Sequence, residues 1–335
     1  MRFCNHPFHT LHVLNKATFY PYPHYMTCCG SWFSNHNDMI VKGDFRNLWD
    51  MWNHEIFQNL RSSWLSSDSR LCLNCPVLSS APKHVQYKDS YMTPVMQEGP
   101  RYITFANDQT CNLHCWTCRI RPIIDKNQQA VFEQTNLVLD TFKDSITWIE
   151  CIGSGDPFAS PAWRKILQQL DPSLYNDLSI EIFTNGILIP RYWDSIKNIH
   201  SNIKNIKVSI DAATEETYNK TRLGSTFSEL TDAMQFVSKL GKEIHVNMVV
   251  QQDNFREIPL FIEQAFNIYG ASFVNLTMMG FWGRTDRKLF ESKDISNKDH
   301  PMYHEFLTTV QENLDIILDT RVNSVEVNRA TNLHI

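Results

Sequence analysis

Residues 102–118 read YITFANDQTCNLHCWTC, a short apolar stretch followed by three closely spaced cysteines. The apolar stretch at 102–106 predicts a β-strand, and Cys111, Cys115 and Cys118 come on the loop directly after it. Thiolates are the usual protein ligands of iron–sulfur clusters. Three of them on one loop predict a [4Fe–4S] cubane that has one iron without a protein ligand.

Zinc is the alternative occupant of this loop. Structural zinc sites are four-coordinate and commonly take their cysteines from CxxC-type pairs. The loop instead supplies three cysteines in a CxxxCxxC pattern. The pattern therefore favours an iron–sulfur cluster over zinc or a chance grouping.

Downstream of the loop, strand and helix patterns alternate. Strands are expected at 102–106, 146–152, 178–184, 204–210, 244–250 and 272–278, and helices at 129–143, 161–170, 188–199, 226–240, 254–269 and 301–318. Six strand–helix units in series predict a parallel sheet with helices outside it, and right-handed crossovers curl such a sheet towards a barrel. Six units are fewer than the eight of a closed barrel. The expected fold class is therefore α/β, a partial (β/α)6 TIM-like barrel with ligands at the carboxyl ends of its strands.

Upstream of residue 102 the pattern is different. Residues 8–14 and 17–22 predict a hairpin, and apolar residues recurring every fourth position predict a helix from Arg46 to Leu65. Residues 79–100 hold three prolines and little periodicity, which indicates a linker.

The expected domain division follows from this change of pattern. A small cysteine-rich α+β domain with its linker occupies residues 1–95, and the partial barrel occupies residues 96–335.

Composition narrows the class of protein. The chain has 335 residues, of which 42% are hydrophobic and 20% charged, as in an ordinary globular protein. A net charge of −5 argues against nucleic acid as a partner. No apolar run approaches the ~20 residues that cross a bilayer, and the first ten residues lack the apolar core of a secretory signal. We therefore expect a cytoplasmic protein without a membrane partner, in which nine cysteines stay reduced and available for metal.

A CxxxCxxC loop after the first strand of a partial α/β barrel resembles the signature of the radical S-adenosylmethionine (radical SAM) superfamily. The resemblance covers about residues 100–335. In that family the open iron chelates the amino and carboxylate groups of S-adenosylmethionine (SAM), and electron transfer into the sulfonium yields a 5′-deoxyadenosyl radical. The resemblance implies an enzyme in which Cys111, Cys115 and Cys118 bind the catalytic [4Fe–4S] cluster. It also implies a flavodoxin- or ferredoxin-type electron donor.

Further motifs follow in the order that the family has them. The segment Gly153-Ser154-Gly155-Asp156 looks like the start of the GGEP motif, which binds the amino group of SAM. Here Ser154 replaces a glycine and Asp156 replaces the usual glutamate. The next motif, Thr184-Asn185-Gly186, looks like the family's TNG.

Two later features complete the resemblance. Ser209-Ile210-Asp211 looks like SID, which meets the ribose or carboxylate of SAM, and Arg222 matches an arginine that pairs with the carboxylate. The family's aromatic residue before the third cysteine is replaced by Thr117, so no adenine contact is assigned. The residues expected to contact SAM are Gly153, Ser154, Gly155, Asp156, Thr184, Asn185, Ser209, Asp211 and Arg222.

The N-terminal cysteines resemble the SPASM or twitch extension of radical SAM enzymes, which carries auxiliary [4Fe–4S] clusters. In the family this extension usually follows the barrel, whereas here it precedes it. The cysteine count implies one auxiliary cluster, and a structural zinc ribbon is the alternative because CxxC suits zinc equally. The implied ligands are Cys4, Cys28, Cys72 and Cys75, with Cys29 as the alternative to Cys28.

The resemblance also implies a range of substrates. Members with such extensions often modify ribosomally made peptides, which is the function expected here. Others oxidise or rearrange small metabolites such as sugars and aminocyclitols. A non-catalytic, metal-bearing scaffold is the third alternative, and only Asp156 and Thr117 favour it.

Overall fold

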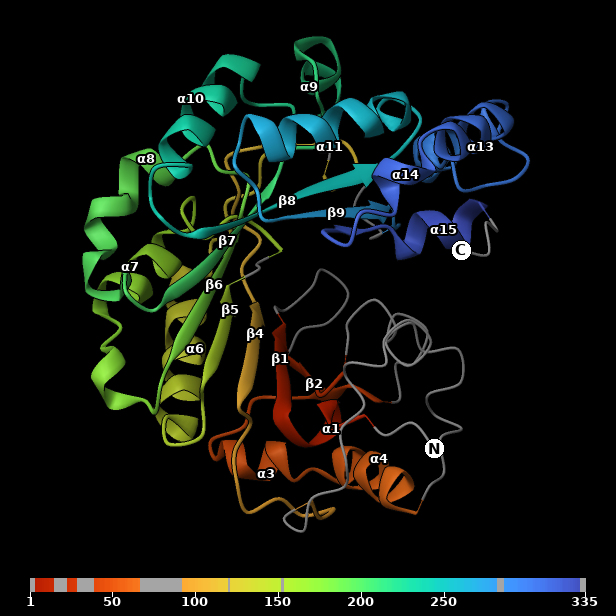
Figure 1. The fold of residues 1–335 in the computed structure, drawn as a ribbon. Coiled ribbons are helices and arrows are strands. Elements are labelled where there is room, and N and C mark those ends of the chain that lie inside the picture. The colour runs from red at the N-terminus through yellow and green to blue at the C-terminus, as the bar shows by residue number, and fades with distance from the viewer. Residues whose placement is uncertain are drawn as a thin grey trace.

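The computed structural model describes residues 4–14, 23–28, 39–66, 92–119, 121–151, 154–281 and 286–331. Their strands form one ten-stranded sheet in the order β10-β9-β8-β7-β6-β5-β4-β1-β2-β3. Because β10 and β3 lie at opposite ends of this order, the sheet is open. Figure 1 shows it curving through the molecule with helices along its outer side.

Six parallel strands make up the body of the sheet, and each lies close to its expected bounds. They are β4 (Tyr102–Ala106), β5 (Trp148–Cys151), β6 (Ser179–Thr184), β7 (Ile203–Ser209), β8 (Glu243–Val250) and β9 (Phe273–Met278). Each pairs in parallel with the next. The expected α/β fold with a partial, unclosed barrel is therefore confirmed.

The connecting helices lie on one side of the sheet, as right-handed crossovers require (Figure 1). Within α10, a capping box between Thr226 and Glu229 satisfies the first backbone donors. The expected helices appear as α6 (Gln128–Phe142), α7 (Pro161–Gln169), α8 (Ile189–Tyr192), α10 (Phe227–Val237), α11 (Ile258–Asn267), α13 (Tyr303–Glu312) and α14 (Leu314–Ile317). Elements that the sequence pattern did not predict are α9 (Glu215–Thr221), α12 (Arg287–Lys293), β10 (Val322–Asn323) and α15 (Val325–Thr331).

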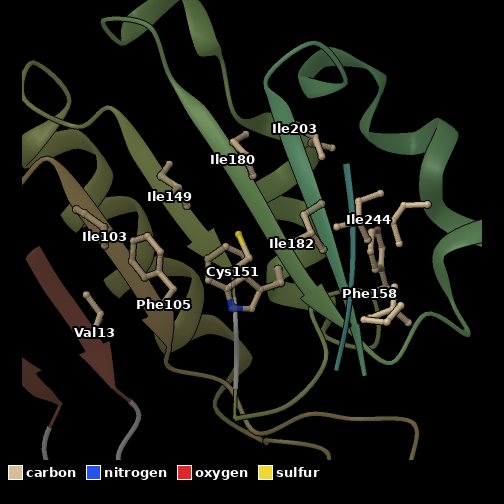
Figure 2. Close-up of a cluster of buried hydrophobic side chains, with 14 of the residues drawn as sticks. Val13, Ile103, Phe105, Ile149, Cys151, Phe158, Ile180, Ile182, Ile203 and Ile244 are labelled. Atoms are coloured by element: carbon tan, nitrogen blue, oxygen red, sulfur yellow. The ribbon is translucent and has the colours of Figure 1, made fainter. Parts of the chain in front are cut away.

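Side chains alternate between the two faces of the sheet. Phe105 packs on Trp163 of α7 with ring centroids 5.3 Å apart, so the face that carries Phe105 is the one covered by helices. That face is apolar and fully buried, and Figure 2 shows members of it. They include Ile103, Phe105, Ile149, Cys151, Ile180 and Ile182. The intervening residues turn to the opposite face and are largely polar.

The N-terminal segment adds three strands to the same sheet. The first, β1 (Thr10–Leu14), pairs in parallel with β4 along its whole length. Antiparallel pairing then adds β2 (His24–Met26) and β3 (Val41–Lys42). The expected hairpin thus has its first arm in β1, while its expected second arm at 17–22 lies outside the described residues. The domain division near residue 95 stays a prediction.

The helix expected from Arg46 to Leu65 is two helices, α3 (Leu48–Trp52) and α4 (Glu55–Leu65). The break occurs because His54 takes an extended conformation, and its Nδ1 accepts the Ile56 N–H as the cap of α4. A short helix, α1 (His6–His9), precedes β1.

A buried arginine ties these N-terminal elements together. Arg61 of α4 donates to the carbonyl oxygens of Pro7 at 2.8 Å and Pro94 at 3.1 Å. Its guanidinium carbon also lies 4.3 Å from the ring centroid of Trp52. Residues 92–100 therefore pack against the N-terminal helices, whereas residues 79–91 of the expected linker lie outside the described residues.

Among the described residues, none of the helices has the length and apolar character needed to cross a bilayer.

Candidate functional site

The cysteine loop follows β4 and is clamped from two sides. The Asp156 N–H donates to the Thr110 carbonyl at 2.7 Å, which brings the loop after β5 against it. The His114 N–H donates to the Leu223 carbonyl at 2.9 Å, which brings in the segment after α9. Segments that the sequence motifs singled out are therefore adjacent in space.

Two glycines make this close approach possible. A Cβ on Gly155 would lie 2.1 Å from the Thr110 carbonyl oxygen, so no other residue fits there. Gly224 has a φ of +105°, and a Cβ on it would lie 3.2 Å from the Asn112 carbonyl oxygen. The cysteine loop thus rests on backbone at both places.

Each cysteine of the loop has N–H groups directed at its sulfur. Cys111 Sγ accepts from the Leu113 backbone at 3.4 Å and from Asn185 Nδ2 at 3.7 Å. Cys115 Sγ accepts from Arg222 Nη1 at 3.7 Å. The Cys118 Sγ accepts from Arg119, at 3.4 Å from Nε and 3.2 Å from Nη2.

This donor arrangement fits an iron–sulfur cluster. N–H donors and two guanidinium groups stabilise sulfur that carries negative charge, as it does when bound to iron. Burial raises the pKa of the Cys111 thiol to about 12 and also raises that of Cys115. A bound metal would hold these groups as thiolates despite that burial.

A site for a single metal ion would need its ligand atoms to converge on one point, unlike a cubane cluster. In the described part of the chain, no three His, Cys, Asp or Glu side chains form a group that could hold one metal ion. In a cubane each iron takes its own thiolate, so its ligands do not have to meet at one point.

Asp156 links the loop after β5 to the turn after β6. Its Oδ2 accepts from Thr184 Oγ1 at 2.7 Å and from the Asn185 N–H at 2.8 Å. Its Oδ1 accepts from the Phe158 N–H at 3.0 Å and the Ala159 N–H at 3.3 Å. The side chain is buried, and that burial raises its pKa. The carboxylate, which was expected to contact SAM, therefore has four internal donors.

Asn185 connects the same turn to the cysteine loop. Its Nδ2 donates to Asn112 Oδ1 at 2.9 Å in addition to its contact with Cys111. Its Oδ1 accepts the Ile187 N–H at 3.1 Å. Gly186 follows with a φ of +86°, which turns the chain away from the strand.

Asp211 and Arg222 form a buried ion pair, with 2.8 Å between Asp211 Oδ2 and Arg222 Nη2. Asp211 has a φ of +61°, and its Oδ1 also accepts the Val249 N–H at 2.8 Å. The ion pair and the nearby Cys115 raise the pKa of Arg222 against the effect of burial. Arg222 Nε is buried and has no partner within the described residues, so one donor of this guanidinium is left over. Ser209 ends β7, two residues before Asp211.

Arg119 is a site residue that the motifs missed. It is 4% exposed, and besides Cys118 it reaches the Gln109 carbonyl at 2.6 Å and the Ser154 carbonyl. It thus joins the third cysteine to the loop after β5. The only signal in the sequence is a cation directly after Cys118.

Other expected site residues are only partly described. Cys4 is buried and Cys28 is half-buried. Gly153, Cys29, Cys72 and Cys75 lie outside the described residues. The auxiliary cluster site therefore stays a prediction.

Comparison with protein families and with curated proteins gives matches to parts of the chain. The model of the Radical SAM superfamily matches residues 109–265. A GTP 3′,8-cyclase of Alkaliphilus oremlandii (strain OhILAs) is 26% identical over 219 residues, which are 62% of this chain and 64% of that protein. A GTP 3′,8-cyclase of Alkaliphilus metalliredigens (strain QYMF) is 24% identical over 164 residues, 48% of this chain and 50% of that protein. The chain thus spans between half and two thirds of the length of these relatives.

Solved structures that match the chain have lower sequence identity to it than these relatives have. Streptococcus suis SuiB bound to its precursor peptide SuiA is 13% identical, with a TM-score of 0.47, and the match covers 96% of this chain and 72% of SuiB. Native anSMEcpe with bound AdoMet is 17% identical, with a TM-score of 0.40 and 62% coverage of both chains. These scores are too low for either likeness to support a conclusion.

Proposed function

We propose that this protein, whose residues 109–265 belong to the radical SAM superfamily, is an enzyme that cleaves SAM reductively. A [4Fe–4S] cluster would supply the electron, and the resulting 5′-deoxyadenosyl radical would take a hydrogen atom from a C–H bond of the substrate. The observation that carries the proposal is the arrangement around the cysteine loop. Three cysteines receive N–H donors at the carboxyl end of a parallel sheet, against the loop that follows β5.

The residues of the chain divide into those that hold the cluster and those that orient SAM. Cys111, Cys115 and Cys118 would bind three irons. Arg119 and Asn185 direct N–H groups at the sulfurs of this set, which orients the ligands and stabilises their charge.

SAM would be oriented by residues at the strand ends. Because the Asp156 carboxylate has four internal donors, the backbone of residues 153–155 is the part of that motif left to bind the amino group. Arg222 retains an unpartnered buried Nε that suits a ligand carboxylate. Thr184, Asn185, Ser209 and Asp211 complete the proposed set.

The proposed substrate is a ribosomally made peptide. The support is the resemblance of the N-terminal cysteines to extensions found on peptide-modifying members of the family. In this proposal Cys4, Cys28, Cys72 and Cys75 bind an auxiliary [4Fe–4S] cluster, and a flavodoxin- or ferredoxin-type protein supplies electrons. The matches to proteins named GTP 3′,8-cyclase favour a second candidate, radical chemistry on a small molecule.

Metal counting tests the proposal directly. The protein is purified anaerobically, reconstituted, and assayed for iron, sulfide and zinc beside a Cys111→Ala/Cys115→Ala/Cys118→Ala variant. About eight irons falling to about four in the variant supports one cubane in each segment. About four falling to none, with one zinc retained, keeps the catalytic cluster and makes the N-terminal site structural.

Formation of 5′-deoxyadenosine from SAM under dithionite then distinguishes an enzyme from a scaffold. An intact cluster without this product favours the scaffold. Absence of iron from both proteins overturns the proposal.

A further inference from the structure

A row of polar residues crosses the sheet on the face turned away from the helices. His12, Thr104, Glu150, Glu181 and Asn205 pair one with the next in register, from β1 through β4, β5 and β6 to β7. Each of the first four lies between two apolar residues of its strand that face the helices. Asn205 instead follows the exposed Lys204, at the point where the register between β6 and β7 shifts. These five residues and Lys207, which reaches two of them, are called the polar row below.

The charged members of the polar row contact one another. Lys207 Nζ lies 2.5 Å from Glu181 Oε1 and 3.4 Å from Glu150 Oε1. Thr104 Oγ1 donates to Glu150 Oε2 at 2.9 Å. The side chains of Glu181, Glu150 and Lys207 are 6%, 21% and 27% exposed. The row is therefore mostly screened from bulk water but is not sealed from it.

The polar row has more negative groups than positive ones. Lys207 balances one carboxylate, and burial together with the neighbouring Glu150 raises the pKa of Glu181 to about 7. Burial alone would raise the pKa of Glu150, but the hydrogen bond with Glu181 and the charge of Lys207 lower it overall. Burial lowers the pKa of His12 to about 4, so its imidazole is neutral near pH 7. Within the described residues no second side-chain cation pairs with Glu150 or Glu181, so below about pH 7 a proton on Glu181 balances the second carboxylate.

A polar atom at each end of the polar row lacks a hydrogen-bond partner in the described part of the chain. Asn205 is 7% exposed, and its buried Oδ1 has no hydrogen-bond partner in the described part of the chain. The buried Nε2 of His12 likewise has none among the described residues. On the next strand, His245 Nε2 is 3.0 Å from Glu243 Oε1, so these two groups satisfy each other. The Asn205 side-chain oxygen therefore needs a hydrogen-bond donor, and His12 Nε2 needs one in the tautomer that carries its proton on Nδ1.

We propose that the polar row binds an ammonium or guanidinium group of the substrate. Such a group supplies several N–H donors and one positive charge, which replaces the proton on Glu181 and balances the second carboxylate. An anionic group such as a phosphate would meet two carboxylates. Glu181 is three residues before Thr184 on β6, so the bound cation would lie ~10 Å deeper than the SAM site at the strand ends. The inference rests on the proposed function, because it names a chemical class of substrate for the same barrel.

Calorimetry with simple cationic probes tests this inference. Nα-acetyl-lysine methylamide and Nα-acetyl-arginine methylamide are titrated into the full chain at pH 6.5, with the norleucine analogue as the neutral comparison. Measuring the heat in two buffers of different ionisation enthalpy counts the protons released. We expect both cationic probes to bind, the norleucine analogue not to bind, and release of up to about one proton.

Two variants make the test specific. Glu181→Gln keeps the size of the side chain but has no proton to lose, so we expect at least tenfold weaker binding and no proton release. Glu263→Gln, on the exposed face of α11, is the matched control and should bind as the wild type does. Equal binding of the norleucine analogue, unchanged proton release in Glu181→Gln, or no binding at ~10 mM probe overturns the inference.

Cleavage of SAM, which tests the proposed function, is assayed separately in the same protein preparations. Dithionite-driven formation of 5′-deoxyadenosine is measured for the wild type and for Glu263→Gln, which lies outside both the SAM site and the polar row. If the wild type binds the cationic probes but never forms 5′-deoxyadenosine, the proposed function fails and the cation site stands. If it forms the product but ignores the probes, only the cation site fails.

Discussion

At the residue scale, Arg119 is the side chain whose replacement should change the cluster most selectively. It directs two N–H groups at Cys118 Sγ, and these stabilise the more negative, reduced state of a bound cluster. We expect Arg119→Met to lower the reduction potential of the catalytic cluster, and Arg119→Lys to lower it less because the charge remains. Potentiometric titration followed by electron paramagnetic resonance measures this.

The control is Arg121→Met, two residues further on and exposed. It should leave the potential of the reconstituted cluster where the wild type has it. An unchanged potential in Arg119→Met would mean that the contact with Cys118 only positions the loop.

Gly155 supports a second prediction at this scale. Gly155→Ala places a Cβ 2.1 Å from the Thr110 carbonyl, so the backbone of the cysteine loop must move. We expect a loss of about 1–3 kcal/mol in unfolding free energy, the usual cost of overpacking, together with reduced iron incorporation. Chemical denaturation and iron analysis measure the two effects.

Gly270→Ala is the control that distinguishes a steric clash from the backbone strain of placing a side chain at a positive φ. Gly270 has a φ of +63°, and a Cβ there would meet nothing within 4 Å. The Gly270→Ala variant should therefore lose about 1 kcal/mol of unfolding free energy and incorporate as much iron as the wild type. Equal iron losses in both variants would contradict the proposed role of the 155–110 contact.

The sequence predicts which residues form this site better than it predicts which groups hydrogen-bond to them. The spacing of Cys111, Cys115 and Cys118 is local, so one stretch of chain reveals it. The four donors to Asp156 come partly from the turn after β6, almost thirty residues away, and no pattern around Asp156 indicates them. Arg119 escaped notice because a lone cation beside a cysteine has no periodicity.

At the element scale, the polar row makes stability depend on pH. The pKa of Glu181 rises from 4.5 to about 7 on folding, so the native state holds more protons between these values. Stability should therefore fall as pH rises through that window, by at most about 3 kcal/mol. His12 acts in the opposite sense, because its pKa falls from 6.5 to about 4 and its contribution is lost as pH falls.

The difference between wild type and Glu181→Gln isolates the first effect, because His12 is common to both. We expect the unfolding free energy of the wild type to decline relative to the variant between about pH 4.5 and pH 7. Urea denaturation across this range measures it. Parallel curves for the two proteins would mean that Glu181 ionises normally in the folded state.

Helices and strands were predictable where the pattern of apolar residues within one segment is sufficient to indicate them. The six parallel strands are apolar runs between helices, and each was found close to its expected place. The position of β1 was not predictable, because its pairing with β4 joins residues about ninety apart. The break between α3 and α4 was hidden because the apolar spacing continues across His54.

At the scale of the whole molecule, the position of β1 predicts how the chain unfolds. Its five residues pair with β4, and Arg61 joins α4 to the segment before β4. We therefore expect the N-terminal segment and the barrel to melt in one transition. Differential scanning calorimetry and far-UV circular dichroism should give the same midpoint. Two separate transitions would instead support independent domains on either side of residue 95.

The open sheet also affects the tendency of separate copies of the chain to aggregate. An unclosed sheet offers unpaired backbone groups along its outer strands, and long outer strands recruit other chains into fibrous aggregates. Here the outermost strands of the described sheet, β3 and β10, are two residues long each. Such short outer strands present few unpaired amides and carbonyls, so the open sheet discourages edge-to-edge aggregation.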